Sequence, residues 1–398
     1  MKSENRSTKS EVGVATRLIH AGETDASAPA PLTTPIYETT TFVFDNAQDV
    51  VAYNEGRSTK HLYSRYTNPT IVAAEKKLAA LDGAESALLF SSGQGATTTI
   101  LLAHLKAGDE IVCGAAIYGG TLHLLEDVLA RFGVSPRFVS LDELADPASI
   151  IGDRTRMVWF ESPINPTLRC VDVARIARAC RARGVLSVID NTFACPINQQ
   201  PLALGVDLAM QSVTKYLNGH SDVTGGMVAG PRALVAPIEK ARRQVGTVMD
   251  PYPAYALGRG LKTLPLRVAQ HNANALAVAT FLSGDSRVSR VYYPGLPSHP
   301  DHDIATRQMT GYGGMVTFDL DGRFDRAERV YDRLQIVKRA ASLGGIESLI
   351  SLPVITSQWG HTDEQLQAAG VTRGMLRLSV GLEDVADLIA DLDQALES

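Results

Sequence analysis

Apolar and polar positions along the middle of the chain alternate between two spacings, which separate short β-rich runs from helix-length amphipathic runs. The expected strands span 87–90, 110–113, 137–140, 157–161, 185–190 and 207–212, and the expected helices span 71–81, 97–106, 121–132 and 173–183. This alternation predicts the α/β class, with a mainly parallel sheet flanked by helices. Ligand-binding groups should then lie at the carboxyl ends of the strands.

The segments on either side of this region have other patterns. Pro29, Pro31 and Pro35 lie in a segment of little periodicity that leads into the mixed stretch 37–66, which predicts an extended arm. A long apolar-periodic stretch at 255–282 precedes strand-like runs at 288–293 and 314–320, a loop at 294–303 and mixed elements at 327–334, 376–380 and 385–396. We therefore expect an arm at 1–65 that packs on a neighbouring subunit, a large domain at 66–257 and a smaller α+β domain at 258–398.

Charge and composition narrow the choice of partners and compartment. The 398 residues include 38 Lys and Arg against 43 Asp and Glu, a net charge of −5 without long single-sign blocks, which argues against nucleic-acid binding. Residues 1–11 lack the apolar core of a secretory signal, and no apolar run approaches the roughly 20 residues of a membrane helix. The four cysteines lack CxxC spacing and are expected as buried thiols of a cytoplasmic protein.

Lys215 lies where a reactive lysine is expected. It follows the predicted strand 207–212, Ser212 and Thr214 precede it closely, and a glycine-rich stretch follows at 219–226. A lysine amine at a ligand-binding edge beside two hydroxyls suits a Schiff base next to a phosphate. A surface lysine after a strand is the competing interpretation of this segment alone.

Asp190 ends the otherwise apolar run 185–190. An ionised carboxylate there is destabilising unless a cation meets it, and a protonated pyridine nitrogen is such a cation. Capping of a following helix is a frequent alternative use of Asp at this point. Lys215 at the next strand edge favours the cofactor interpretation.

Gly93 and Gln94 belong to a small-residue turn, Ser-Ser-Gly-Gln-Gly-Ala, between a predicted strand and a predicted helix. Small residues let backbone N–H groups and a helix N-terminus approach an anion. The turn lacks the third glycine and the well-placed acid of a dinucleotide-binding loop, so a phosphate cradle is the better interpretation.

Taken together, these elements resemble the Cys/Met-metabolism (transsulfuration) family of pyridoxal-phosphate (PLP) enzymes. The resemblance runs in order from about residue 16 to residue 396. It rests on the motifs Tyr63-Ser64-Arg65-Tyr66, Ser91-Ser92-Gly93, Tyr118-Gly119-Gly120-Thr121, Glu161-Ser162-Pro163, Asn165-Pro166-Thr167, Asp190-Asn191-Thr192, Thr214-Lys215-Tyr216, Gly219-His220-Ser221-Asp222, Ser342-Leu343-Gly344-Gly345 and Arg377-Leu378-Ser379. It implies PLP-dependent transferase fold type I, like that of aspartate aminotransferase.

The resemblance also implies how the chain would hold PLP. Lys215 would carry the cofactor as a Schiff base and shuttle protons once released, Asp190 would pair with the ring nitrogen, and Tyr118 would stack on the ring and assist the leaving group. The phosphate would be bound by the backbone amides of Gly93 and Gln94, the hydroxyls of Ser212 and Thr214, and Tyr63 and Arg65 of a neighbouring subunit.

For the substrate, the resemblance implies that Arg377 binds the carboxylate beside Asn165 and Ser342, because an arginine fork can hold a carboxylate through two bonds. Glu161 would support these groups without touching the substrate itself. Judged singly, Tyr118 could instead be a core tyrosine and Asn165 a turn residue.

The activity implied is PLP-dependent γ-elimination or γ-replacement on sulfur amino acids or O-acylhomoserines, in a homotetramer built from dimers with shared sites. Methionine γ-lyase-like or O-acylhomoserine sulfhydrylase-like chemistry is the main interpretation, and cystathionine γ-synthase or γ-lyase is the alternative. Ala341 stands where cystathionine-handling members commonly have Glu, and Gly120 where methionine γ-lyases often have Cys. A nicotinamide-dependent oxidoreductase and a non-catalytic interaction protein are remote alternatives, since the glycine fingerprint is incomplete while Lys215 and Asp190 are both present.

Overall fold

The computed structural model describes residues 13–23 and 31–397, so the polar stretch 1–11 and Pro29 lie outside the described residues. A seven-stranded sheet, in the order β1-β7-β6-β5-β4-β2-β3, forms the centre of the larger part of the molecule. Its strands are β1 (Ser86–Phe90), β2 (Glu110–Gly114), β3 (Ser135–Val139), β4 (Thr155–Glu161), β5 (Leu186–Asp190), β6 (Leu208–Ser212) and β7 (Gly226–Gly230). Strands β2 to β6 pair in parallel and β7 is antiparallel to both neighbours, which confirms the predicted mainly parallel sheet.

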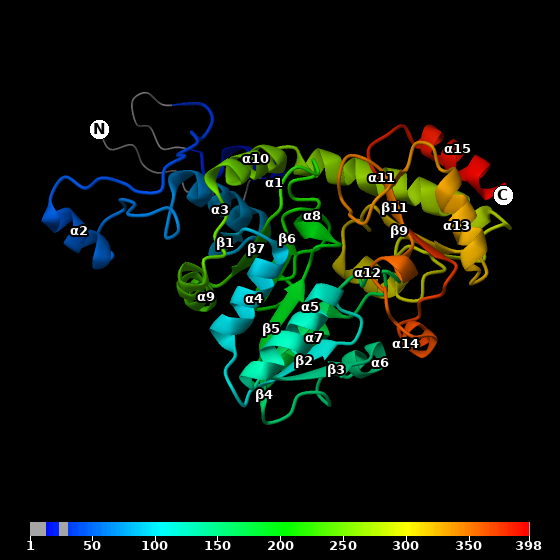
Figure 1. Cartoon of the computed structure of the whole chain (residues 1–398), viewed down its shortest axis with the longest axis horizontal. Helices are drawn as coiled ribbons and strands as arrows, with labels where there is room; N and C mark the ends of the chain where they lie inside the picture. The colour runs from blue at the N-terminus through cyan, green and yellow to red at the C-terminus, as the bar shows by residue number, and fades with distance from the viewer. Residues whose placement is uncertain (1–12, 24–30, 398) are drawn as a thin grey trace.

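Helices cover both faces of this sheet (Figure 1). On β1, Ala87 and Leu89 belong to a core with helix α3, while Leu88 and Phe90 point to the opposite core with α4 and α9, as the two-residue period of a strand requires. The helices and turns of this part are α3 (Pro69–Asp82), α4 (Gly93–His104), α6 (Leu141–Ala145), α7 (Val173–Ala182), α8 (Cys195–Asn198) and α9 (Arg232–Val245).

One predicted helix and one predicted periodic stretch are divided into shorter elements in the structure. The expected helix at 121–132 is a helical run of changing pitch, formed by α5 (Gly119–His123), the π-helix η1 (Leu124–Val128) and the 3₁₀ turn η2 (Leu129–Phe132). The periodic stretch at 255–282 contains two helices, α10 (Pro251–Leu261) and α11 (Leu264–Gly284). The break falls at Lys262 and Thr263, because Pro265 suits a first helical turn better than a helix interior.

A five-stranded sheet, in the order β10-β11-β12-β9-β8, forms the centre of the C-terminal part. Its core is built with α11, α13 and α15, whose apolar faces pack against β9 and β12. The elements are β8 (Arg290–Tyr292), α12 (His302–Gln308), β9 (Met315–Asp319), α13 (Phe324–Arg333), β10 (Lys338–Arg339), β11 (Leu349–Ser351), η3 (Pro353–Ile355), α14 (Asp363–Ala368), β12 (Met375–Ser379) and α15 (Val385–Leu396). The α+β mixture expected for this part is therefore present, although α12 begins inside the expected loop 294–303.

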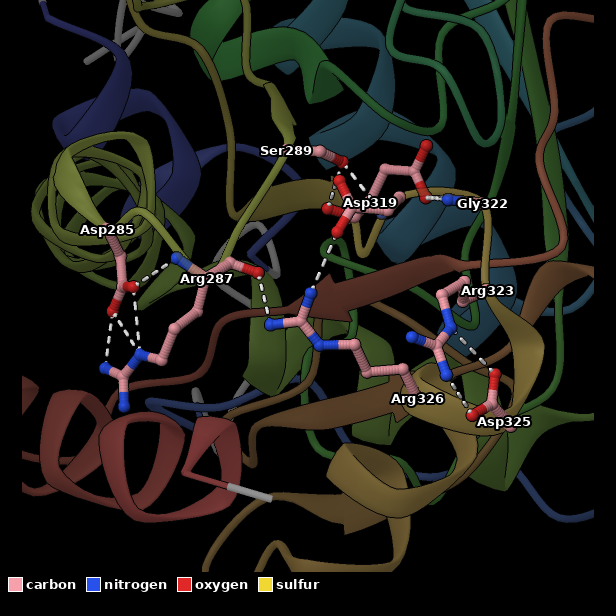
Figure 2. A network of polar contacts seen from close by, with 9 residues as sticks. Asp285, Arg287, Ser289, Asp319, Gly322, Arg323, Asp325 and Arg326 are labelled. Carbon is pink, nitrogen blue, oxygen red and sulfur yellow. Dashed lines mark hydrogen bonds and ion pairs between the residues drawn. The ribbon is translucent and has the colours of Figure 1, made fainter.

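A polar network joins the turns at one edge of this second sheet (Figure 2). Arg326 on α13 donates to the Arg287 carbonyl oxygen before β8 (2.8 Å) and pairs with Asp321 after β9 (2.9 Å). The Ser289 hydroxyl donates to the Asp319 carbonyl oxygen (2.8 Å). These bonds fix the turns around β8 and β9 relative to α13.

The N-terminal arm is not uniformly extended. Besides α1 (Val14–His20), it contains the helix α2 (Ala47–Asn54), which projects from the body of the molecule (Figure 1). The domain boundary expected at residue 257 falls within α10. Within the described ranges, no helix combines the length and the apolar character needed to cross a membrane.

Candidate functional site

A cavity of about 560 Å³ lies at the carboxyl ends of β4, β5 and β6, where β12 and the turn before β11 close it from the C-terminal part. The residues predicted for the site that line it are Gly93, Gln94, Tyr118, Asn165, Asp190, Ser212, Thr214, Lys215, Ser342 and Arg377. The structure thus brings together ten positions that are spread over nearly 300 residues of sequence. Roles for these positions follow from the chemistry of each side chain.

The first turn of α4 offers free backbone donors to the cavity. Ser92 caps this helix by accepting the Gly95 N–H (2.9 Å), which leaves the N–H groups of Gly93 and Gln94 without an intrahelical acceptor. Gly226 of β7 packs on this turn so closely that an added Cβ would lie 2.4 Å from the Ser92 carbonyl oxygen. Backbone N–H groups at a helix N-terminus are a suitable site for a phosphate.

Hydroxyl groups from β6 and the residues after it complete the anion-binding end. A Cβ on Gly93 would lie 3.4 Å from Ser212 Oγ, so this hydroxyl faces the helix N-terminus. Thr214 Oγ1 accepts the Gly225 N–H (3.0 Å) and donates to the Gly225 carbonyl oxygen (3.3 Å), and because a hydroxyl can rotate, its proton could turn from this long bond toward a bound oxygen.

Asp190 is held by a short relay of hydrogen bonds. The Ser212 N–H donates to Thr192 Oγ1 (2.8 Å), so the Thr192 hydroxyl donates in turn to Asp190 Oδ1, and the Thr192 N–H reaches the same oxygen (3.0 Å). Although Asp190 faces the cavity, it lies deep enough for burial to raise the pKa of its carboxyl. No lysine, arginine or histidine of the described residues lies within 4 Å of it.

Lys215 follows β6 and points across the cavity, where its Nζ donates to Ser342 Oγ (2.9 Å). Burial, together with the positive charge of Arg377, lowers the pKa of this amine below its ordinary value. A depressed pKa increases the share of neutral amine, which is the form that attacks a carbonyl carbon or accepts a proton.

Arg377 on β12 is 8% exposed and has no carboxylate partner among the described residues. Its Nη1 donates to Asn165 Oδ1 (2.9 Å), its Nη2 reaches the Ser342 carbonyl oxygen (3.4 Å), and its Nε has no hydrogen-bond partner. Burial lowers its pKa to about 10, so it remains charged at neutral pH. A buried guanidinium of this kind is prepared to receive an anion such as a carboxylate.

Tyr118 precedes α5 directly and is 51% exposed. Its backbone N–H donates to the carboxylate of Glu161, at the end of β4 (2.6 Å). Gly120 follows closely, and a Cβ there would lie 2.6 Å from the Tyr118 ring, so a larger residue at position 120 would displace this ring.

Two predicted residues do not line the cavity of this chain. Tyr63 and Arg65 lie on the arm, where the Arg65 guanidinium donates to the Arg243 carbonyl oxygen and covers the ring of Tyr66 at 4.9 Å. Conversely, Thr356 and Ser357 line the cavity and were not singled out from sequence. They lie in an irregular turn after η3 that carries no motif, so only the folded chain identifies them.

Comparison with known proteins agrees with this arrangement. Residues 15–397 match the family described as Cys/Met metabolism PLP-dependent enzyme. The chain is 40% identical to L-methionine gamma-lyase of Pseudomonas putida, over 97% of this chain and 98% of the relative. It is 41% identical to the chloroplastic cystathionine gamma-synthase 1 of Arabidopsis thaliana, over 96% of this chain and 68% of the relative.

A solved structure is similar along the whole chain. The structure of cystathionine gamma-lyase from Lactobacillus plantarum complexed with L-serine superposes with a TM-score of 0.91 at 36% identity, covering 97% of this chain and 99% of the other. This likeness confirms the PLP-enzyme fold that the sequence motifs imply.

Proposed function

Because the chain belongs to the Cys/Met-metabolism family of PLP-dependent enzymes, we propose that it catalyses γ-elimination or γ-replacement on a sulfur amino acid or an O-acylhomoserine. One observation carries the proposal. The partly buried amine of Lys215 and the buried cation Arg377 have no carboxylate partner among the described residues, and they share a cavity with Asp190, which forms no ion pair there. The family match sets aside the nicotinamide-dependent and non-catalytic alternatives.

The charges and the shape of the cavity fit PLP. The N–H groups of Gly93 and Gln94, which have no intrahelical acceptor, suit its phosphate. The close approach of Gly226 to Ser92 makes the cavity narrow at this N-terminus of α4. Asp190 suits a protonated ring nitrogen, and the neutral amine of Lys215 suits its aldehyde. When bound, the protonated ring withdraws electrons from the substrate Cα and so stabilises negative charge there.

The protein residues would then position the substrate and move its protons. Arg377, oriented by Asn165, would bind the carboxylate and direct the Cα–H toward Lys215. Lys215 Nζ, once free and neutral, would take the proton from Cα, and it would have to release that proton before it could accept one from Cβ, while Ser342 Oγ accepts a hydrogen bond from the amine and holds it in place. The Tyr118 hydroxyl, at the open end of the cavity, would exchange a proton with the γ-substituent as it departs.

The main form of the proposal is chemistry like that of methionine γ-lyase or O-acylhomoserine sulfhydrylase, with cystathionine γ-synthase or γ-lyase as the alternative. The γ-lyase of Pseudomonas putida and the γ-synthase of Arabidopsis thaliana are almost equally identical to this chain, so identity does not rank the two branches. Ala341 supports the main form, because this wall of the cavity has no carboxylate to attract the distal ammonium of cystathionine.

The assembly and the location belong to the same proposal. We infer a homotetramer built from dimers, in which Tyr63 and Arg65 complete the site of a neighbouring subunit. The exposed apolar residues Leu32 and Val43 of the arm support a contact with a second chain. Four buried free thiols support a cytoplasmic location.

The Lys215→Ala variant tests the proposed function. The purified wild type should be yellow, and the variant should lose both turnover and the visible absorption band while its melting temperature stays close to wild type, since Lys215 serves chemistry more than packing. Exposed Lys76→Ala is the matched control and should keep both. An unchanged band in Lys215→Ala would refute the assignment.

Product assays distinguish the two branches. Methionine, cystathionine and O-acylhomoserines, each with and without a thiol, should show which γ-substituent leaves and whether a thiol replaces it. Release of a 2-oxo acid and ammonia indicates elimination, whereas a new thioether indicates replacement.

A further inference from the structure

Glu161 is a second carboxyl group at the edge of the sheet that holds Asp190. Glu161 ends β4 and Asp190 ends β5, and the two are register partners on adjacent parallel strands. Glu161 is only 5% exposed and lines the same cavity. Its bond from the Tyr118 N–H is short, at 2.6 Å.

Two neighbouring carboxyl groups in this position create an excess of negative charge. No cationic side chain of residues 13–23 and 31–397 forms an ion pair with either of them, because Lys215 is turned to Ser342 and Arg377 to Asn165. A ring nitrogen supplies one positive charge, which balances one carboxylate. Like charges at register positions on adjacent strands disfavour the ionisation of both groups, so one proton remains on the pair.

We propose that Glu161 is a positioning residue that keeps this proton. As a neutral acid it would hold the Tyr118 backbone against the sheet edge and leave Asp190 as the sole anion beside the ring nitrogen. The inference rests on the proposed function and extends it to a residue that does not touch the reacting atoms.

The surroundings of Glu161 determine which member of the pair holds the proton. Burial and, next, the charge of Asp190 raise the pKa of Glu161 well above its ordinary value, against a smaller lowering by the Tyr118 N–H. Burial also raises the pKa of Asp190, but this carboxylate accepts two hydrogen bonds from Thr192 that oppose the rise and favour its ionised form. Cys113 on β2 also lies near Glu161, but burial raises the pKa of this thiol and keeps it neutral. The proton therefore belongs on Glu161.

Tyr118 needs such an anchor because packing does not hold it. Tyr118 is about half exposed, and α5, which begins directly after it, starts with two glycines that provide no side chains to pack against the ring. Backbone bonds hold the two ends of this turn: the Tyr118 N–H donates to Glu161, and the Gly120 carbonyl oxygen accepts from Gln94 Nε2 (2.8 Å). Loss of the first bond would let the ring move away from the cofactor.

Two substitutions of Glu161 separate its charge from its hydrogen bond. Glu161→Gln keeps an acceptor for Tyr118 and mimics the neutral acid, whereas Glu161→Leu has similar size and no acceptor. Two readouts need no turnover: the affinity of the apoprotein for PLP, and the pH midpoint and circular dichroism of the visible band.

The Gln variant should match wild type within about threefold in affinity and should keep the pH midpoint. The Leu variant should bind PLP about tenfold more weakly, with a reduced circular dichroism band, because a buried N–H loses its acceptor. Glu161→Ala replaces Leu if the latter fails to fold. Glu110→Gln is the control. Glu110 is the first residue of β2 and so lies at the amino-terminal edge of the sheet, away from the cavity, and its substitution should change neither readout.

A Gln variant that binds PLP tenfold more weakly or shifts the pH midpoint by a unit would show that Glu161 is ionised and would overturn the proposal. Variants that both behave like wild type would overturn it as well, because the anchor would then be dispensable. Failure of the proposed function is distinguishable, since the wild type would then bind PLP and yet turn over none of the γ-substituted substrates, whereas the two readouts used here need no turnover.

Discussion

Lys215, Asp190 and Arg377 each place an ionisable group in a part of the molecule that otherwise favours apolar side chains. Burial acts on each in the direction that opposes its charge, lowering the pKa of the two cations and raising that of the carboxyl. Arg377 keeps its charge nonetheless, and Lys215 gains neutral amine. Groups of opposite charge thus share one cavity without forming an ion pair with one another. This arrangement is typical of a site that binds a charged ligand.

The predicted positions of Lys215 and Asp190 illustrate what the sequence could and could not specify. Both lie at the carboxyl ends of parallel strands, and the rule that these ends share one edge was sufficient to bring them together. The bond from the Tyr118 N–H to Glu161 was not predictable, because it joins a backbone group and a side chain 43 residues apart. Such a pair leaves no periodic signal in either segment.

Ala341 supplies a residue-scale prediction about substrate choice. It lines the cavity next to Ser342, and Ala341→Glu would add a carboxylate that attracts a distal ammonium group. Wild type should favour methionine, homocysteine or an O-acylhomoserine over cystathionine, and the variant should shift the kcat/KM ratio about tenfold toward cystathionine. Steady-state assays of the two substrates in parallel measure the ratio.

The neighbouring Ala340 provides the control for this substitution. It is exposed but does not line the cavity, so Ala340→Glu adds the same charge without facing the substrate. Its kcat/KM ratio should stay near that of wild type. A tenfold wild-type preference for cystathionine would refute the role given to Ala341 and would leave the cofactor assignment intact.

At the scale of elements, strands with alternating or continuous apolar residues were predictable, whereas a strand that begins and ends with glycine was not. Strand β7 reads Gly-Met-Val-Ala-Gly and lies buried between β1 and β6. Glycine is depleted in strands because it lacks a side chain to pack, so propensity argues against this assignment. Here close packing requires it, since a Cβ on Gly226 or Gly230 would lie within 2.7 Å of neighbouring backbone.

The junction between α3 and β6 supplies a prediction about stability and pH. Asp82, the last residue of α3, is buried against Gln211 of β6, and within the described part of the chain its oxygens accept hydrogen bonds only from the Gln211 amide, at 3.4 Å. Burial raises the pKa of Asp82 to about 8, so the folded protein keeps a proton that the unfolded chain releases above pH 4. This group therefore lowers the free energy of unfolding as pH rises from 4 to 8, and its contribution is constant above 8.

Asp82→Asn should remove this pH dependence. Relative to wild type, the free energy of unfolding of the variant should rise by about 1.4 kcal/mol per pH unit between pH 5 and pH 7. Urea titrations at several pH values measure the difference, with exposed Asp142→Asn as the control. Parallel curves for wild type and Asp82→Asn would contradict the prediction.

At the scale of the whole molecule, the arm is the part least explained by a single chain. Leu32 and Val43 are more than 90% exposed, although the exposure of large apolar side chains to water does not stabilise a single chain. Helix α2 projects from the body with no buried residue (Figure 1). A contact between chains cannot be derived from the pattern of one sequence, so the expectation of a partner rested on the low periodicity of the arm and on the family resemblance around Tyr63 and Arg65.

The shared-site proposal leads to a test by subunit mixing. If Arg65 binds the phosphate in a neighbouring subunit, Arg65→Ala should weaken PLP retention although Arg65 does not line the cavity of its own chain. At limiting PLP, Arg65→Ala and Lys215→Ala should each be inactive alone. A mixed dimer would contain one site with both residues intact and one with neither.

Random exchange in an equal mixture pairs half of the subunits with the other variant, and each mixed dimer restores one of its two sites. We therefore expect about a quarter of wild-type activity after exchange, provided that the dimer has two-fold symmetry. Exchange is verified by mass spectrometry of tagged subunits, and mixtures prepared without exchange serve as the control. If Arg65 acts only within its own chain, every site in the mixture carries one defect, and activity would stay at the level of the separate variants.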